Sequence, residues 1–282
     1  MPANNDALVT TDWVAEHLDD PGVVIAEVDE DATAYTKSHI RGAVGFDWRA
    51  DFQDTLRRSF VSAQDFAALM ESRGIGNDTH VVVYGGSNNW FAAYAYWYFK
   101  VYGHDRVSLM DGGRKLWELQ GRELTAEETK AEPRPGYTTG AADESIRAKR
   151  DQILADFVGA PEGVALVDVR SPAEFNGEIA APEHLPQEAA QVKGHIPGAA
   201  NVPWASAVNA DTGEFLATDE LRSLYEGKGV TPDKEVAAYC RIGERSAHTW
   251  FVLHEILGYD QVRNYDGSWT EYGSLVDVPV ER

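Results

Sequence analysis

The sequence predicts an α/β protein with two tandem domains, each an open parallel β-sheet flanked by helices. Three observations lead to this prediction: a length of 282 residues, a long internal repeat, and short apolar segments that alternate with helical patterns. At about 150 residues per domain, the length fits two domains. Segments that are apolar throughout are typical of parallel strands covered by helices on both faces.

The repeat consists of motifs that recur at a nearly constant spacing. VVVYG and VAAYC end two apolar segments whose tyrosines, Tyr84 and Tyr239, lie 155 positions apart. SHIRGAVGFDW (38–48) likewise matches GHIPGAANVPW (194–204), whereas EVDEDATAY (27–35) and DVRSPAEF (168–175) are about 15 positions closer. The second copy therefore contains an insertion, which we place near IAAPEHLPQEAAQVK (179–193).

A linker separates the two copies. The segment TAEETKAEPRPG (125–136) holds charges and two prolines but no large apolar residue, so it cannot form core. We predict a first domain over 1–124, a linker over 125–145 and a second domain over 146–282.

Each copy repeats the same order of elements. In the first copy we expect a helix over 61–74 whose N-cap is Ser62, with Asp65 three residues further on. The other expected helices begin near residue 89 and lie around 115–119, and the strands lie at 23–28, 81–84 and 107–110. In the second copy we expect strands at 164–168, 235–239 and 261–265, and helices at 217–229 and 245–257.

Composition and charge exclude several classes of function. With 46 acidic and 25 basic residues the formal net charge is −21, which repels nucleic acid and anionic membranes. The longest apolar run, Trp90–Phe99, is half the ~20 residues needed to span a bilayer, and MPANNDALVT does not resemble a signal peptide. A single cysteine excludes an internal disulfide and a four-cysteine zinc site. We therefore expect a cytoplasmic protein with no metal and no cofactor.

That cysteine, Cys240, lies where open α/β sheets bind ligands. It ends the strand EVAAYC, and the loop up to Arg245 connects it to a helix expected near Ser246. Backbone N–H groups of the loop, the positive end of the helix and the charges of Arg241 and Arg245 all favour a thiolate. Gly243 gives the loop the conformational freedom that it needs. We expect a lowered thiol pKa and a nucleophilic cysteine.

Two other interpretations of Cys240 are weaker. A cysteine at a strand end is often a small buried apolar residue, but the residues that follow it here are polar, and the first copy has Gly85 in its place. A phosphatase loop has five residues between cysteine and arginine, whereas four separate Cys240 from Arg245. The tighter loop leaves less room for a phosphate, although it could hold one additional sulfur atom.

Together, the duplication, the linker, the cysteine loop and VRNYDGSWTEY (262–272) resemble the tandem-domain rhodaneses, a thiosulfate sulfurtransferase family. The resemblance extends from about Leu8 to Pro279. It implies a catalytic Cys240, a substrate-facing Arg241 and a catalytically inactive first domain. It also implies that Trp90, with Phe91, lines the substrate cleft.

The resemblance implies a mechanism as well. The Cys240 thiolate attacks the outer sulfur of thiosulfate, sulfite leaves, and a thiophilic acceptor such as cyanide takes the sulfur from the resulting persulfide. Arg241 and Arg245 balance the charge of this small anionic donor, in an active-site loop completed by Ile242, Gly243 and Glu244. No second cysteine is present to resolve the persulfide, so the acceptor comes from outside.

Two departures from the family leave the donor open. Ile242 replaces a lysine, and Glu174 replaces a substrate-binding arginine. 3-Mercaptopyruvate as donor, or delivery of sulfur to a partner protein, are the alternatives. Glu174 either repels a dianion or pairs with Arg170 or Arg245, and we favour pairing.

Two further expectations concern supporting residues. Asp168 and Arg170 are expected to form an ion pair that supports the loop. His39 and His195 are expected to be structural, because they recur in both copies.

Overall fold

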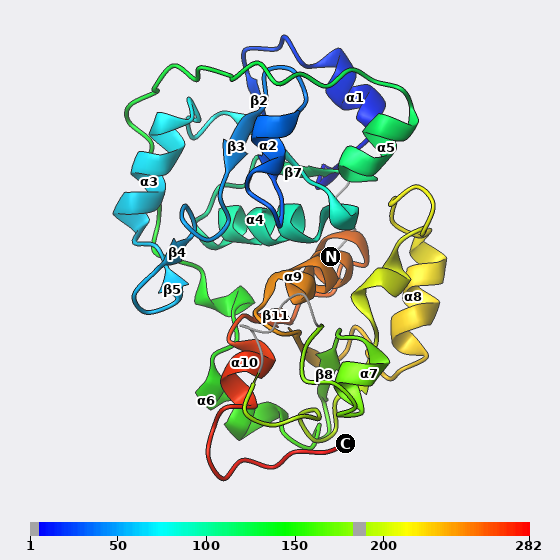
Figure 1. Ribbon diagram of the computed structural model, residues 1–282. Coiled ribbons are helices and arrows are strands. Elements are labelled where there is room, and N and C mark those ends of the chain that lie inside the picture. The colour runs from blue at the N-terminus through cyan, green and yellow to red at the C-terminus, as the bar shows by residue number, and fades with distance from the viewer. Residues whose placement is uncertain (1–5, 183–189) are drawn as a thin grey trace. The chain divides into compact units, whose positions relative to one another are not determined.

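The computed structural model describes residues 6–182 and 190–282, which form two compact units (Figure 1). The N-terminal unit runs up to Asp143 and includes Asn209–Phe215, and the C-terminal unit comprises Glu144–Val208 and Leu216–Arg282. The domain ranges given above stay a prediction. Part of the insertion predicted near 179–193 falls outside the described residues.

The N-terminal unit contains a five-stranded parallel sheet in the order β1-β7-β6-β2-β3. Its strands are β1 (Leu8–Val9), β2 (Val23–Val28), β3 (Val44–Phe46), β6 (His80–Tyr84) and β7 (Val107–Met110). A separate antiparallel ribbon joins β4 (Gln53–Asp54) and β5 (Ser59–Phe60). The helices are α1 (Thr11–Glu16), α2 (Ala34–Lys37), α3 (Ala63–Ser72), the short η1 (Ser87–Asn89), α4 (Trp90–Val101) and α5 (Gly113–Leu119).

Two helices of this unit illustrate how the sequence determines its structure. Ser62 caps α3 as predicted, because its side chain accepts a hydrogen bond from the Asp65 amide at 3.1 Å. Helix α4 is buried along almost its whole length and contacts β2, β6 and β7. Its aromatic run is therefore core of the N-terminal unit.

The C-terminal unit contains a four-stranded parallel sheet in the order β11-β10-β8-β9. Its strands are β8 (Val164–Asp168), β9 (Ala200–Asn201), β10 (Glu235–Tyr239) and β11 (Val262–Tyr265). The α-helices are α6 (Arg150–Gln152), α7 (Pro172–Phe175), α8 (Thr218–Glu226), α9 (Glu244–Phe251) and α10 (Ser268–Tyr272). Shorter helical segments are η2 (Glu144–Ile146), η3 (Ile153–Phe157), η5 (Trp204–Ala207) and η6 (Val252–Ile256). Helix α9 packs on β10 and β11.

The two sheets confirm the internal repeat down to single residue pairs. The order β7-β6-β2-β3 corresponds to β11-β10-β8-β9, and isolated bridges recur at matching positions. The antiparallel bridges are His39–Thr125 and His195–Glu281, and the parallel pairs are Leu8–Leu109 and Arg147–Asn264.

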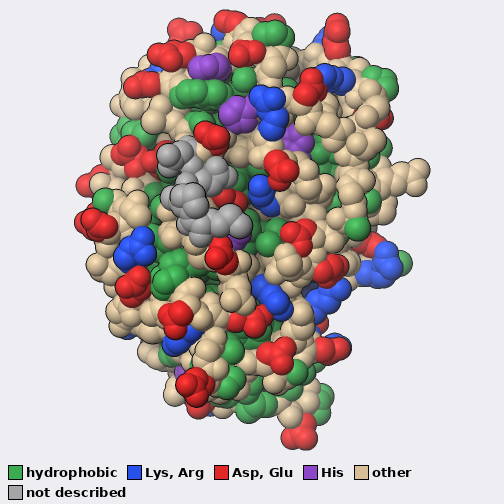
Figure 2. All heavy atoms as spheres, turned by 180° about the vertical axis from the view of Figure 1, so that it is seen from behind, with side chains coloured by type: hydrophobic (Ala, Val, Ile, Leu, Met, Phe, Trp, Pro, Cys, Tyr) green, Lys and Arg blue, Asp and Glu red, His purple; other side chains and the backbone are tan. Residues whose placement is uncertain are grey.

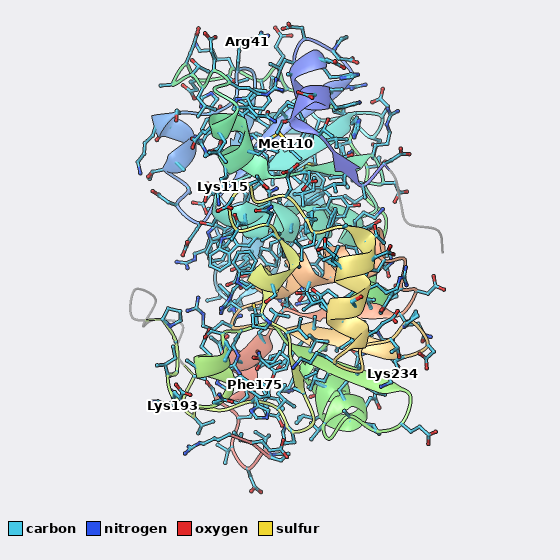
Figure 3. All side chains as sticks on the ribbon, turned by 90° about the vertical axis from the view of Figure 1, so that its right-hand side faces the viewer. Arg41, Met110, Lys115, Phe175, Lys193 and Lys234 are labelled. Carbon is cyan, nitrogen blue, oxygen red and sulfur yellow. The ribbon has the colours of Figure 1, made fainter. Side chains whose placement is uncertain are left out.

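Both repeated histidines make the same local contacts. The His39 Nδ1 lies 2.7 Å from the Tyr35 carbonyl oxygen, and the His195 Nδ1 lies 2.9 Å from that of Phe175. The His39 ring also stacks on the ring of Tyr35, and the His195 ring stacks on the ring of Phe175, which is labelled in Figure 3. These contacts fit the structural role expected for His39 and His195.

One segment from the second half of the sequence packs in the N-terminal unit, outside the domain range predicted for it. The amide of Phe215 donates to Asp111 Oδ1 at 3.0 Å, and the Lys115 ammonium donates to the Ala210 carbonyl oxygen. Lys115 lies on α5 (Figure 3). Burial raises the pKa of Asp111 to about 6. Residues 209–215 therefore complete the first unit rather than the second.

The first copy closes its loop around Gly85, the equivalent of Cys240. The Gly85 amide donates to Asn89 Oδ1 at 2.9 Å, and the Asn89 amide group donates to the Met110 carbonyl oxygen at 2.6 Å. A Cβ atom at position 85 would lie 2.2 Å from the carbonyl oxygen of Val28. The loop therefore has no space for a thiol side chain.

We predict that Gly85→Ala lowers the free energy of unfolding by at least about 1–3 kcal/mol, because the added methyl group overlaps a backbone oxygen. Gly140→Ala is the control, because a Cβ atom there meets no atom within 4 Å. Urea unfolding of both variants measures the difference. Equal unfolding midpoints would show that the Gly85 loop accommodates a side chain.

Candidate active site

Cys240 directly follows β10, the central strand that pairs with β8 and β11. Tyr239, the last residue of β10, is in register with Asp168 and Tyr265. Helix α9 begins at Glu244, two residues earlier than predicted, so Arg245 lies in the first turn of the helix. Gly243 has a φ of +104°, and a Cβ atom there would lie 2.7 Å from Asp266 Cα. The tight connection between β10 and α9 therefore requires glycine at position 243.

The Cys240 sulfur lies between a hydrogen-bond donor and an acceptor. The Gly243 amide donates to Sγ at 3.1 Å, and the thiol donates to Glu244 Oε2 at 3.3 Å. The Cys240 amide donates to Ser268 Oγ at 3.1 Å. Cys240 is 0% exposed, so these protein groups replace water around it.

The expected lowering of the thiol pKa is wrong for this structure. Burial raises the pKa of Cys240 above its ordinary value, and the negative charge of Glu244 raises it further. The positive charge of Arg245 and hydrogen bonding by Ser246 lower it only in part. The cations and N–H groups of the loop are evident from the sequence, whereas the contact between Glu244 and the sulfur depends on the folded structure.

Glu174 pairs with Arg245, one of the two partners that the sequence analysis names. Its carboxylate oxygens lie 3.3 and 3.4 Å from the Arg245 Nη atoms. The Ser171 amide and hydroxyl also donate to Glu174 Oε2, at 3.1 and 2.9 Å. Burial opposes ionisation, but the charge and hydrogen bonds of Arg245, with the Ser171 hydrogen bonds, hold the pKa of Glu174 below its usual value.

Arg245 also faces the carboxylate beside the thiol. Its Nε lies 3.8 Å from Glu244 Oε1, while the other oxygen of Glu244 accepts the Cys240 proton. Glu174, Arg245 and Glu244 are at most 5% exposed. They form a buried chain of charges that ends at the sulfur, which we call the Glu174–Arg245–Glu244 chain.

The expected ion pair between Asp168 and Arg170 is present at the end of β8. Its shortest N–O distance is 2.5 Å and both residues are fully buried. The guanidinium carbon of Arg170 lies 4.6 Å from the ring centre of Trp269, and Arg170 donates to the Gly194 carbonyl oxygen at 2.7 Å. The pair therefore joins the end of β8 to α10 and to the segment before β9.

The other predicted loop residues are buried in the same unit. Arg241 is 1% exposed, and its carbonyl oxygen accepts hydrogen bonds from the Thr270 amide at 3.0 Å and hydroxyl at 2.9 Å. Ile242 is 8% exposed. Trp90 begins α4 in the N-terminal unit, and its role at the substrate cleft stays a prediction.

Two residues that hold the loop were not assigned a role from the sequence. The Asn264 side chain donates to the Gly243 carbonyl oxygen at 3.0 Å and accepts from the Ser246 hydroxyl at 2.6 Å. The Ser268 hydroxyl oxygen accepts the hydrogen bond from the Cys240 amide. Both belong to the segment 262–272, so that motif was the signal that could have identified them.

The negative net charge is spread over the surface, whereas the charges at Cys240 are buried. Figure 2 shows acidic side chains over much of one face, with basic side chains among them. Within residues 6–182 and 190–282, no three His, Cys, Asp or Glu side chains are grouped as a metal site. The same residues include no helix with the length and apolarity needed to cross a membrane.

Comparison with known proteins places this geometry in a family. The family model described as "Rhodanese-like domain" matches the chain twice, over residues 10–120 and 152–275. The two matches correspond to the two copies of the repeat.

Relatives with similar sequences cover the whole chain. A Mycolicibacterium smegmatis protein named "Putative thiosulfate sulfurtransferase" is 58% identical over 279 residues, which is 99% of each chain. The "Sulfur carrier protein TtuD" of Thermus thermophilus is 54% identical over 281 residues, 99% of this chain and 98% of the relative.

Solved structures with low sequence identity share the fold. The wild-type structure of EanB has a TM-score of 0.83 and 23% identity, and the match covers 98% of this chain and 69% of EanB. An anaerobic ergothioneine biosynthesis enzyme from Chlorobium limicola matches with a TM-score of 0.83 and 22% identity, over 98% of this chain and 70% of that enzyme.

We predict that Glu174→Arg lowers the free energy of unfolding by about 3–5 kcal/mol, because it replaces the buried partner of Arg245 with a second cation. Glu178→Arg makes the same charge change at an exposed position of the same segment and is expected to change stability by less than about 0.5 kcal/mol. Urea unfolding compares the two variants. If Glu174→Arg is as stable as Glu178→Arg, the ion pair does not support the loop.

Proposed function

The chain belongs to the rhodanese-like domain family, and from this we propose that it transfers the sulfane sulfur of thiosulfate to a thiophilic acceptor such as cyanide through a persulfide on Cys240. The observation that carries the proposal is the environment of Cys240. The only thiol in the chain follows the central strand of its sheet, with a backbone N–H aimed at its sulfur. An enzyme that holds an anionic sulfur needs such a donor.

In the proposed first half-reaction, Cys240 loses its proton and attacks the outer sulfur of thiosulfate. A bond forms between Sγ and that sulfur, the original S–S bond breaks, and its electron pair leaves with sulfite. The Gly243 amide and the N-terminal end of α9 then stabilise the negative charge on the persulfide. Arg241 and Arg245 are proposed to balance the charge of the donor.

In the second half-reaction an acceptor from outside takes the sulfur. Cyanide carbon forms a bond to the outer sulfur, the S–S bond of the persulfide breaks, and the electron pair returns to Cys240. The chain has no second cysteine that could do this. A protein acceptor is the second candidate, and the relative named as a sulfur carrier favours it.

We also propose a cytoplasmic location. The single cysteine supports it, because this chemistry needs a reduced thiol and the chain cannot form an internal disulfide.

We predict that thiosulfate adds about 32 Da, one sulfur atom, to the protein, and that cyanide removes it. Cys240→Ser should add no sulfur and should produce no thiocyanate, because it lacks the attacking thiol. Intact-protein mass spectrometry and a thiocyanate assay measure the two quantities. An unmodified wild-type mass, or turnover by Cys240→Ser, would contradict the covalent mechanism.

The same assays separate the alternative donors and acceptors. Thiocyanate formation with thiosulfate and with 3-mercaptopyruvate, each in turn, identifies the preferred donor. A carrier would acquire the added mass but would turn over slowly with cyanide and faster with a protein thiol.

A further inference from the structure

The Glu244 carboxylate contacts the Cys240 thiol but has no role in the two half-reactions proposed for Cys240. Among the described residues, it is the hydrogen-bond acceptor that the structure gives to the Cys240 thiol, with an Sγ–Oε2 distance of 3.3 Å. Its other oxygen lies 3.8 Å from Arg245 Nε. The guanidinium group therefore holds one carboxylate oxygen while the other faces the sulfur.

Burial gives this contact a chemical consequence. Cys240 is 0% exposed and Glu244 is 1% exposed. Proton transfer from the thiol requires an acceptor within hydrogen-bond reach, and Glu244 Oε2 meets that condition. Glu244 is therefore positioned to accept the proton that leaves Cys240 on attack.

We propose that Glu244 is a proton relay, which takes the proton of Cys240 during attack and returns it to the leaving group, and that this adapts the site to organic persulfide donors of the form R–S–S⁻. The proposal rests on the proposed function of Cys240 as the sulfur-carrying residue. It names the donor class for the same site.

The reaction balances without any further reagent. The Cys240 proton moves to Glu244, and the thiolate forms a bond to the outer sulfur of R–S–S⁻. The S–S bond of the donor breaks and its electron pair goes to R–S⁻, which takes the proton from Glu244 and leaves as R–SH. The products are R–SH and the Cys240 persulfide anion, with the original charge on Glu244.

Proton return by Glu244 assists the departure of a thiolate more than the departure of sulfite. A free thiol has a pKa of about 8.5, so a departing thiolate is protonated at neutral pH. Sulfite is a weaker base and leaves readily as an anion. Returning the proton therefore assists a persulfide donor more than it assists thiosulfate.

The local charge favours the same donor class. Arg241 and Arg245 carry two positive charges, and Glu174 and Glu244 carry two negative charges, so these four buried side chains have no net formal charge. A dianion such as thiosulfate gains little attraction from them, and Glu244, which contacts the sulfur, repels it directly. A donor with a single negative charge experiences less repulsion.

Glu244→Gln tests the relay, because it keeps the shape of the side chain but cannot accept the proton. Persulfide formation is measured in single turnovers by mass spectrometry, with cysteine persulfide and with thiosulfate as donors at neutral pH. We expect the rate with cysteine persulfide to fall about 100-fold or more, the usual contribution of a positioned acid–base group. The rate with thiosulfate should fall by a smaller factor, because Glu244 takes the Cys240 proton in that reaction too but sulfite leaves without needing the proton back.

Glu174→Gln is the matched control. It removes the same charge and also contacts Arg245, but no hydrogen bond joins it to the Cys240 sulfur. It should change the rates with both donors by about the same factor. If Glu244→Gln also changes both rates by the same factor, Glu244 is not a relay and the proposal is overturned.

A second readout does not depend on sulfur transfer. The pH profile of Cys240 alkylation by iodoacetamide should move to lower pH in Glu244→Gln, because the neighbouring negative charge is gone; an unmoved profile would also overturn the proposal. If the wild type forms no persulfide with either donor while the alkylation profile still moves, the proposed function fails and the Cys240–Glu244 contact stands.

If Glu244→Gln does not fold, Glu244→Asp replaces it. This variant should slow the reaction with cysteine persulfide more than the reaction with thiosulfate, by smaller factors than Glu244→Gln. Equal changes with both donors would overturn the relay.

Discussion

The interaction on which the site depends is the buried Glu174–Arg245–Glu244 chain that ends at the Cys240 sulfur. Arg245 lies between the carboxylates of Glu174 and Glu244, which are each 1% exposed. Removing Arg245 would therefore leave two buried negative charges without their shared positive partner. The chain joins α7, which contains Glu174, to the first turn of α9, which contains Arg245 and Glu244. Its charges thus determine both the shape of the loop and the protonation of the thiol.

The two copies of the repeat separate what the fold needs from what the chemistry needs. Both sheets have the same strand order, and the same histidine bridges recur in each. Yet the loop after β6 is closed around Gly85, where the Val28 carbonyl oxygen leaves no room for a side chain. The fold is therefore stable without a thiol, and the reactive group belongs to one loop of the second copy.

Much of this arrangement could be predicted from the sequence, because it depends on local patterns. The apolar segments at 23–28 and 235–239, the Ser62 cap and the position of Cys240 at a strand end all follow from periodicity and short-range chemistry. The direction of the thiol pKa shift could not be predicted in this way. It depends on the start of α9 at Glu244, which brings a carboxylate to the sulfur, and on complete burial, which only the packed structure reveals. The packing of residues 209–215 in the first unit is equally non-local.

Burial and Glu244 keep the resting Cys240 thiol protonated at neutral pH. Because Cys240 is the only cysteine, the ultraviolet absorption of its thiolate can be titrated with pH, with Cys240→Ser subtracted as the blank. We expect a midpoint above the value of about 8.5 that is usual for a free thiol. A midpoint at or below neutral pH would contradict it, and would show that the loop stabilises the thiolate before any donor binds.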